Sequence, residues 1–277
     1  MKKQVITGLI LITAGLLLMT ASFVQAQNSG DFTVPLSDPN KRGKIKVHLN
    51  SGSITVKGTA RKDILVKYSS IEREKHKNKG NSDGNKEGLT RISGGTMDLE
   101  VSENDNTVSV HSDSWNNKLD LQIEIPSGFD LWAHTYNNGE IVVENIQGVV
   151  ELTNYNGEIK AESISGSVVA TTYNGEIKVT FDKVTEGTPM SFSTYNGDVD
   201  LTFPSTLKAS LKMKTERGEI FTGFDVKVVK SAPVQQKDAK SGAFKIVIDE
   251  WMKGDVNGGG PEFTIKNYNG DIFVRKK

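Results

Sequence analysis

The chain contains no cysteine among its 277 residues, which excludes disulfides, thiolate metal ligands and a thiol nucleophile. Basic and acidic side chains number 34 each, so a zero net charge gives no electrostatic reason to expect a nucleic-acid partner. The four histidines, at positions 48, 76, 111 and 134, have none of the spacings typical of zinc sites. We therefore expect no metal site, no cofactor and no nucleic-acid ligand.

Long apolar stretches are also scarce, and the longest lies at the N-terminus. Lys2 and Lys3 precede an apolar run over residues 5–19, and Ala26 follows it at a position suited to signal peptidase. This pattern is typical of a secretory signal peptide over residues 1–26, with an uncleaved membrane anchor as the alternative. We expect cleavage after Ala26, no membrane span afterwards, and a location in the periplasm or at the cell surface.

Glycine, by contrast, is abundant at 27 residues, and it marks an internal repeat. A Tyr-Asn-Gly-acid-Ile/Val motif recurs between residues 135 and 272 and contains five of the six tyrosines. Its glycines are 18, 18, 22, 21 and 52 residues apart, and Gly148 and Gly166 fall halfway between the first copies. A degenerate copy carries Glu216 and Arg217 in place of Tyr and Asn. The spacing indicates short structural units of about nine residues.

Apolar and polar residues alternate with a period of two after each glycine, which predicts a β strand in every unit. Helical periodicity is absent from this region, so we predict an all-β protein. The expected inward-facing residues are mostly β-branched or small, as a narrow β interior requires. They include Ile159, Ala161, Val168, Ala170, Ile177 and Val179.

Two architectures fit strands of this length. An Asn-Gly turn between alternating strands favours an antiparallel meander. The alternative is a β-solenoid in which 18–22 residues make one coil and equivalent residues stack about 4.8 Å apart. We favour the single β-solenoid, because stacked copies of one residue can bond to each other, which explains why the turn keeps its residues in register.

The flanks also alternate, and no linker divides the chain. We expect one β-solenoid domain over residues 44–277, preceded by an N-terminal tail at residues 27–43. Residues 72–88 contain no apolar side chain, and this composition predicts a solvated polar loop. We expect residues 231–242 to form a second segment that departs from the repeated coils.

The repeated Asn-Gly-acid-Ile run resembles the bacterial putative-adhesin family, a group of exported or membrane-tethered β-solenoid domains. The matching runs begin at Asn156, Asn174, Asn196 and Asn269, and Ile123-Glu124-Ile125-Pro126 and Leu201-Thr202-Phe203-Pro204 are also similar. The resemblance covers roughly residues 44–274 and implies a solenoid fold. It provides no catalytic residues to transfer to this chain.

A solenoid places the repeated side chains in columns. The candidate binding ladder is formed by tyrosines whose ring faces can contact sugars, although rings packed on one another at a corner would be structural. Its members are Tyr136, Tyr155, Tyr173, Tyr195 and Tyr268. A structural turn ladder, with glycine supplying a positive φ, is expected from Asn156, Gly157, Asn174, Gly175, Asn196, Gly197, Asn269 and Gly270.

The acid after each glycine forms a further column. Stacked carboxylates repel one another, which raises their pKa or recruits cations. Calcium binding is one interpretation, but we favour a solvated column screened by Lys160 and Lys178, because the calcium-binding nonapeptide is absent. Its members are Glu140, Glu158, Glu176, Asp198, Glu219 and Asp271.

Enzyme signatures are weak. No serine lies in a nucleophile-elbow pattern, and the glycines separate strands rather than form a phosphate loop. We predict a non-catalytic structural or binding module of the cell envelope that recognises envelope polysaccharide or a surface protein. The alternative is a polysaccharide-active β-helix lyase or hydrolase, with acids near the interruption of the repeat at Glu216, Arg217 and Glu219.

Overall fold

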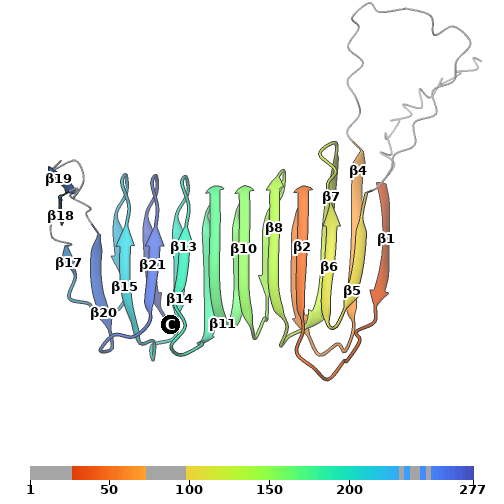
Figure 1. The fold of residues 1–277 in the computed structure, drawn as a ribbon, viewed down its shortest axis with the longest axis horizontal. Coiled ribbons are helices and arrows are strands. Elements are labelled where there is room, and N and C mark those ends of the chain that lie inside the picture. Colours follow the sequence, from red (N-terminus) through yellow and green to blue (C-terminus); the bar gives the residue numbers. More distant parts are fainter. Residues whose placement is uncertain (1–26, 73–97, 231–233, 238–243, 248–250) are drawn as a thin grey trace, which may run out of the picture.

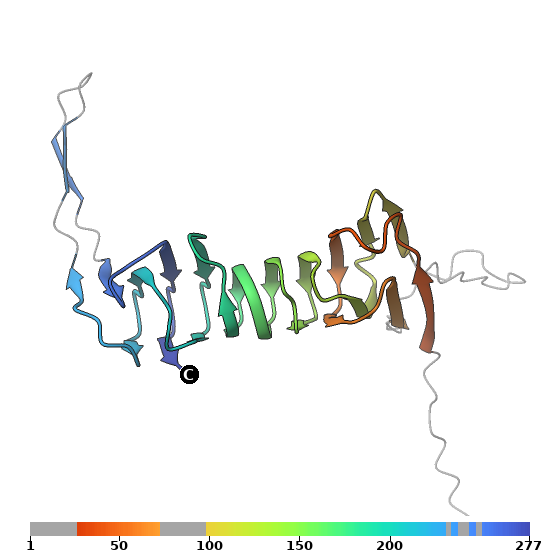
Figure 2. The same ribbon diagram turned by 90° about the horizontal axis from the view of Figure 1, so that it is seen from below.

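The protein is an elongated stack of short β strands (Figures 1 and 2). The computed structural model describes residues 27–72, 98–230, 234–237, 244–247 and 251–277. These residues form twenty-two strands and no helix, which confirms the all-β class. The expected signal peptide at residues 1–26 lies outside the described residues, as does the expected polar loop except for Glu72, the last residue of a strand.

Each coil of the stack contributes one strand to each of two facing sheets. Strand β10 (Val149–Asn156) lies in the first sheet, and the long strand β11 (Ile159–Asn174) crosses from the second sheet into the first. Neighbouring coils pair in parallel and in register, so that Leu152 lies opposite Ala170 and Ile159 opposite Ile177. Parallel pairing confirms the solenoid and rules out the antiparallel meander, which requires hairpin-connected neighbours.

The remaining strands follow in spatial order along the stack. The first sheet contains β5 (Glu100–Asn104), β6 (Thr107–Ser112), β2 (Lys44–Ser51), β8 (Asp130–Asn137), β10, β11, β13 (Met190–Ser193), β21 (Glu262–Lys266), β15 (Ala209–Lys214), β20 (Met252–Val256) and β17 (Val229–Lys230). The second contains β1 (Gln27–Val34), β4 (Ile64–Glu72), β7 (Asn117–Pro126), β3 (Ile54–Thr59), β9 (Ile141–Glu144), β11, β12 (Ile177–Val184), β14 (Val199–Phe203), β22 (Ile272–Lys276) and β16 (Ile220–Thr222).

The order of the coils differs from the order of the chain at both ends. The coil of β2 and β3 lies between the coil of β6 and β7 and the coil of β8 and β9. The last coil, β21 and β22, lies between the coil of β13 and β14 and the coil of β15 and β16 (Figure 1). The 52-residue spacing between Gly218 and Gly270 includes β16, which completes the coil of β15, and β17 and β20, which extend the first sheet beyond that coil, before the chain returns one coil earlier as β21 and β22.

The flanking segments differ in part from their predicted form. The expected tail at residues 27–43 includes strand β1, which pairs antiparallel with β4 and extends the second sheet. The expected excursion at residues 231–242 includes β18 (Val234–Lys237), which pairs antiparallel with β19 (Phe244–Val247) in a separate sheet. Antiparallel strands also border the first sheet, since β5 pairs with β6 and β17 with β20. Antiparallel strands therefore shield both sheets at the N-terminal end and the first sheet at the C-terminal end, whereas β16 of the second sheet pairs only with the parallel strand β22 among the described strands.

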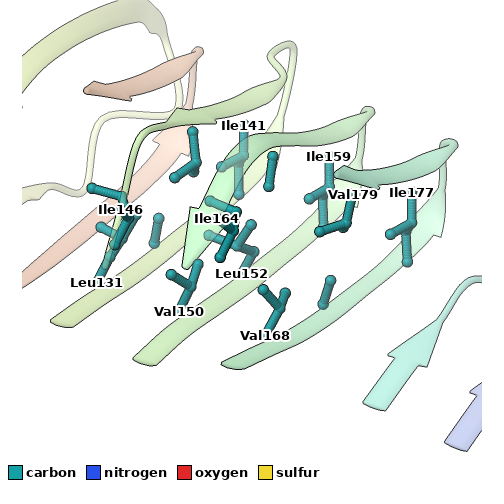
Figure 3. Packing of buried hydrophobic residues seen from close by; sticks show 14 of the residues in the cluster. Leu131, Ile141, Ile146, Val150, Leu152, Ile159, Ile164, Val168, Ile177 and Val179 are labelled. Atoms are coloured by element: carbon teal, nitrogen blue, oxygen red, sulfur yellow. The ribbon is translucent and has the colours of Figure 1, made fainter. Parts of the chain in front are cut away.

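The core is one continuous apolar column between the two sheets (Figure 3). All six predicted inward residues of the central coils are at most 1% exposed. The interior widens toward the C-terminal coils, where Phe181, Phe192, Phe203 and Phe263 are fully buried and contact one another. The period-two pattern therefore specifies which face of every strand is buried.

The repeated glycines are required by the close approach of successive coils. A Cβ built on Gly157 would lie 2.0 Å from the carbonyl oxygen of Gly139, and one on Gly175 would lie 2.1 Å from that of Gly157. Only Gly197 and Gly270 of the predicted turn glycines have a left-handed φ, at +133°. The expectation of positive φ is therefore wrong for Gly157 and Gly175, where lack of space for a side chain is the reason for glycine.

We predict that Gly157→Ala destabilises the protein by about 3 kcal/mol or more, because the added methyl group must push two backbones apart. The matched control is Gly128→Ala, since no atom lies within 4 Å of a Cβ at Gly128 and its φ is not left-handed. Its effect should stay within about 0.5 kcal/mol. Chemical denaturation of both variants measures the difference, and equal stabilities would contradict this account of the glycines.

Candidate functional site

The five predicted tyrosines form a continuous stack of parallel rings along the first sheet. Successive ring centroids are 4.6, 5.1, 4.8 and 4.6 Å apart, and the ring planes differ by 5° or less. The stack results from parallel pairing, which places the same motif position on each coil at the same height. Because each internal ring is covered on both faces, a sugar cannot lie flat on it. The ladder exposes ring edges instead, and Tyr136, Tyr155, Tyr173 and Tyr195 are each 36–41% exposed.

Different side chains close the two ends of the tyrosine ladder. Trp115 packs edge-on against Tyr136, with the ring centroids 5.2 Å apart. At the other end the guanidinium of Arg217 lies over the ring of Tyr268, 5.7 Å from its centroid. The degenerate copy of the motif therefore ends the stack with a cation–π contact instead of a sixth ring.

The predicted asparagines form a second ladder beside the tyrosines. The side-chain amide of Asn156 donates to Oδ1 of Asn137 at 2.6 Å, and Asn174 donates to Asn156 at 2.8 Å. Asn196 and Asn269 continue the chain, each at 2.7 Å. All four bonds point the same way along the solenoid, so each internal amide donates to one neighbour and accepts from the other, which favours cooperative strengthening.

A buried row of Thr and Asn side chains was missed by the sequence interpretation. Each side chain precedes the tyrosine position and donates to the carbonyl of a glycine on an adjacent coil, as Thr172 does to Gly157 at 3.0 Å. The other members are Thr135, Asn154, Thr194, Thr215 and Asn267. The sequence did contain a signal for this row. Every copy of the motif has a Thr or Asn at a position where the alternation of apolar and polar residues predicts an inward-facing apolar side chain.

The acids of the predicted column each lie immediately before a strand of the second sheet, at the corner of the solenoid. Asp198 Oδ1 accepts the backbone N–H of Asp271, and Asp271 Oδ1 accepts that of Glu219, both at 2.8 Å. Burial, and next the negative charge of Glu158, raise the pKa of Glu176, which Lys178 partly offsets. Among the described residues no three of these acids offer ligand atoms close enough to share an ion. The calcium interpretation therefore gains no support from the geometry.

Three histidines that look unrelated in the sequence lie next to one another in the fold. Strand pairing places His48 opposite both His111 and His134, with ring centroids 5.1 and 4.9 Å apart. His111 Nε2 lies 2.9 Å from Oδ2 of Asp113. Burial, and next the proximity of His48, lower the pKa of His134 and so favour its neutral form. The spacing of the histidines in the sequence did not indicate this cluster, because the N-terminal coil is inserted between two later ones. His76 lies outside the described residues.

The groups on which the enzyme alternative depends are engaged in contacts of the solenoid. Glu216 is ion-paired with Lys214 at 2.9 Å, and Arg217 lies over Tyr268. A hollow of about 750 Å³ lies beside them, and its lining includes Met213, Glu219, Phe221, Val228 and Met252. Within the described ranges, no helix has the length and apolar character of a membrane span.

The repeat, the parallel coils and the polar ladders define a two-sheeted β-solenoid. The sequence model of the family described as Toastrack DUF4097 matches residues 133–257. The predicted resemblance to bacterial putative adhesins is thereby confirmed. No curated protein matches the sequence.

Two solved structures resemble the chain. One is a putative cell adhesion protein from Clostridium sporogenes ATCC 15579, 12% identical, with a TM-score of 0.48; the match covers 91% of this chain and 100% of that one. The other is a putative adhesin from Bacteroides fragilis NCTC 9343, 10% identical, with a TM-score of 0.38; the match covers 91% of this chain and 98% of that one.

The buried Thr/Asn row yields a stability prediction. The Oδ1 atom of Asn154 is buried and has no hydrogen-bond partner among the described residues, whereas threonine at this position needs only to donate. We expect Asn154→Thr to stabilise the protein by about 1 kcal/mol, because it removes an unsatisfied buried acceptor. The reverse change, Thr172→Asn, should destabilise by a similar amount. Thermal unfolding of both variants checks the opposite signs, and a shift in the same direction would contradict the explanation.

The acid column yields a pH prediction. A raised pKa means that folded Glu176 holds its proton more tightly than unfolded Glu176, so its contribution to stability falls as pH rises from about 4.5 through the raised folded value. We expect Glu176→Gln to be more stable than the parent at pH 7 and to lose this advantage near pH 4. Glu151→Gln, an exposed acid of the first sheet, is the control. Denaturation at both pH values measures the effect, and an unchanged difference would disprove it.

Proposed function

We propose that the chain is an exported, non-catalytic, adhesin-like binding module of the bacterial cell envelope. The observation that supports this function best is the uninterrupted ladder of five stacked tyrosines, four of which are exposed at their ring edges. The match of residues 133–257 to the Toastrack DUF4097 family model is consistent with it.

The ladder has the physical properties of a recognition surface. Each ring is held by its neighbours before any ligand arrives, so binding sacrifices little side-chain entropy. Tyrosine presents an apolar ring together with a hydroxyl, the combination that is enriched at protein interfaces. A linear array of such groups suits a partner that is itself extended and polar.

The stacking geometry also defines how the partner is contacted. Since the faces of the internal rings are covered, recognition proceeds through phenol hydroxyls and ring edges instead of sugar rings lying flat on aromatic faces. An envelope polysaccharide strand, or an extended segment of a surface protein, presents hydrogen-bonding groups at intervals along its length and so matches this array.

The test is co-sedimentation of residues 27–277, which contain all of the described structure, with isolated cell-envelope fractions. The triple variant Tyr155→Phe, Tyr173→Phe, Tyr195→Phe keeps the ring stack and removes three hydroxyls. We expect the parent to sediment with the envelope and the triple variant to lose at least about tenfold in affinity, since three polar contacts disappear.

The control is Thr180→Val, Thr202→Val, which removes hydroxyls from paired, partly exposed positions on the second sheet. It should bind as the parent does. Absence of binding by the parent would overturn the module itself, whereas equal binding by all three proteins would move the contact surface away from the ladder. Glycosidase or protease treatment of the envelope distinguishes a glycan from a protein partner.

A further inference from the structure

The histidine column is a second feature of the first sheet, independent of the tyrosine ladder. His48 lies on β2, His111 on β6 and His134 on β8, three neighbouring strands of the stack. His48 and His111 are 63 residues apart in sequence, yet their rings are stacked at 5.1 Å with 21° between the planes. The inserted N-terminal coil therefore creates a local histidine concentration that the sequence does not display.

A carboxylate completes the cluster. Asp113 follows strand β6, and its Oδ2 lies 2.9 Å from His111 Nε2. The side-chain amide of Asn50, at the end of β2, donates to the backbone carbonyl of Asp113 at 2.8 Å and ties this segment to the neighbouring strand. One ligand atom from each of His48, His111 and Asp113 lies within 4.8 Å of the other two. Within the described part of the chain, no other group of three or more His, Asp or Glu side chains meets this condition.

We propose that His48, His111 and Asp113 bind a divalent transition-metal ion of the Zn²⁺ or Cu²⁺ type. Two imidazole nitrogens and a carboxylate oxygen form the mixed ligand set that such ions take, at about 2.0–2.2 Å from the metal. Small side-chain rotations draw three atoms already within 4.8 Å to that distance. The ion lies between His111 Nε2 and Asp113 Oδ2, which are now 2.9 Å apart, and a proton on that nitrogen is released to solvent when the ion binds.

The surroundings define the kind of site. His48 and His111 are half-buried and Asp113 is exposed, so the ion is accessible from solvent and keeps a coordination position for water or for a ligand from a partner. His134 packs edge-on against His48 on the opposite side from His111 and limits the movement of that ring. The ion cross-links β2 to β6, which are adjacent in the sheet and distant in the chain, and thereby stabilises the N-terminal coils.

The test is isothermal titration of residues 27–277 with ZnCl₂ in a buffer without chelators. We expect one Zn²⁺ per chain and a loss of at least about tenfold in affinity for both Asp113→Asn and the double variant His48→Gln, His111→Gln. Zn²⁺ should raise the melting temperature of the parent and not that of the double variant. With Cu²⁺, electron paramagnetic resonance should show nitrogen coupling that the double variant lacks.

Two controls keep the outcome unambiguous. Glu151→Gln removes an exposed acid from the same sheet, and His76→Gln removes the fourth histidine; both should bind Zn²⁺ as the parent does. The proposal is overturned by the absence of saturable binding, by equal affinity of the ligand variants and the parent, or by loss of binding in His76→Gln. Without metal, the variants of His48, His111, Asp113 and Glu151 should have the circular dichroism of the parent, since these four side chains are at least partly exposed.

Discussion

The whole structure depends on the close approach of glycine backbones on successive coils. A Cβ would lie about 2 Å from the neighbouring carbonyl at Gly139, Gly157 and Gly175, so only a bare backbone permits the spacing of parallel strands at these corners. Once that spacing is fixed, every other position of the motif is fixed as well. Tyrosine rings stack on tyrosine rings, asparagine amides bond to asparagine amides, and each inward Thr or Asn donates to a glycine carbonyl of an adjacent coil. The ladders are therefore consequences of one steric constraint rather than separate devices.

The insertion of the terminal coils imposes a second constraint on the chain. Strand β22 pairs with β14 on one side and β16 on the other, so the C-terminal segment is an interior part of the stack. At the N-terminal end, the coil of β2 and β3 is likewise an interior part of the stack, with a paired coil on each side. Neither end of the solenoid can form fully until distant segments have met, which raises the contact order and favours slow, cooperative folding. The antiparallel pairs then cover both sheets at the N-terminal end and the first sheet at the C-terminal end, which limits edge-to-edge association there.

The sequence allowed the local structure to be predicted more completely than the arrangement of the coils. The alternation with a period of two correctly identified the six inward-facing residues between Ile159 and Val179. The repeated Asn and Tyr predicted parallel coils, because only stacking explains why the same residue recurs at each position. The histidines could not be placed, since nothing in the residues around His48 specifies that its coil lies between those of His111 and His134. The reason for Gly157 was also misjudged, because a turn and a close approach require the same residue and differ only in φ.

The register that builds the ladders also determines what they can recognise. Stacking covers the faces of the tyrosine rings and leaves edges and hydroxyls, which converts a set of separate aromatic sites into a line of equivalent polar contacts. At the N-terminal coils the same register gathers imidazoles at the height of one strand position, where a carboxylate is available at 2.9 Å. A solenoid thus aligns the side chains that occupy one surface position on neighbouring coils: a residue repeated on five coils forms a linear ridge, as the tyrosines do, and one repeated on three coils forms a local cluster, as the histidines do. The two surfaces are separated by a single side-chain position along β8, where Thr135 points inward between His134 and Tyr136.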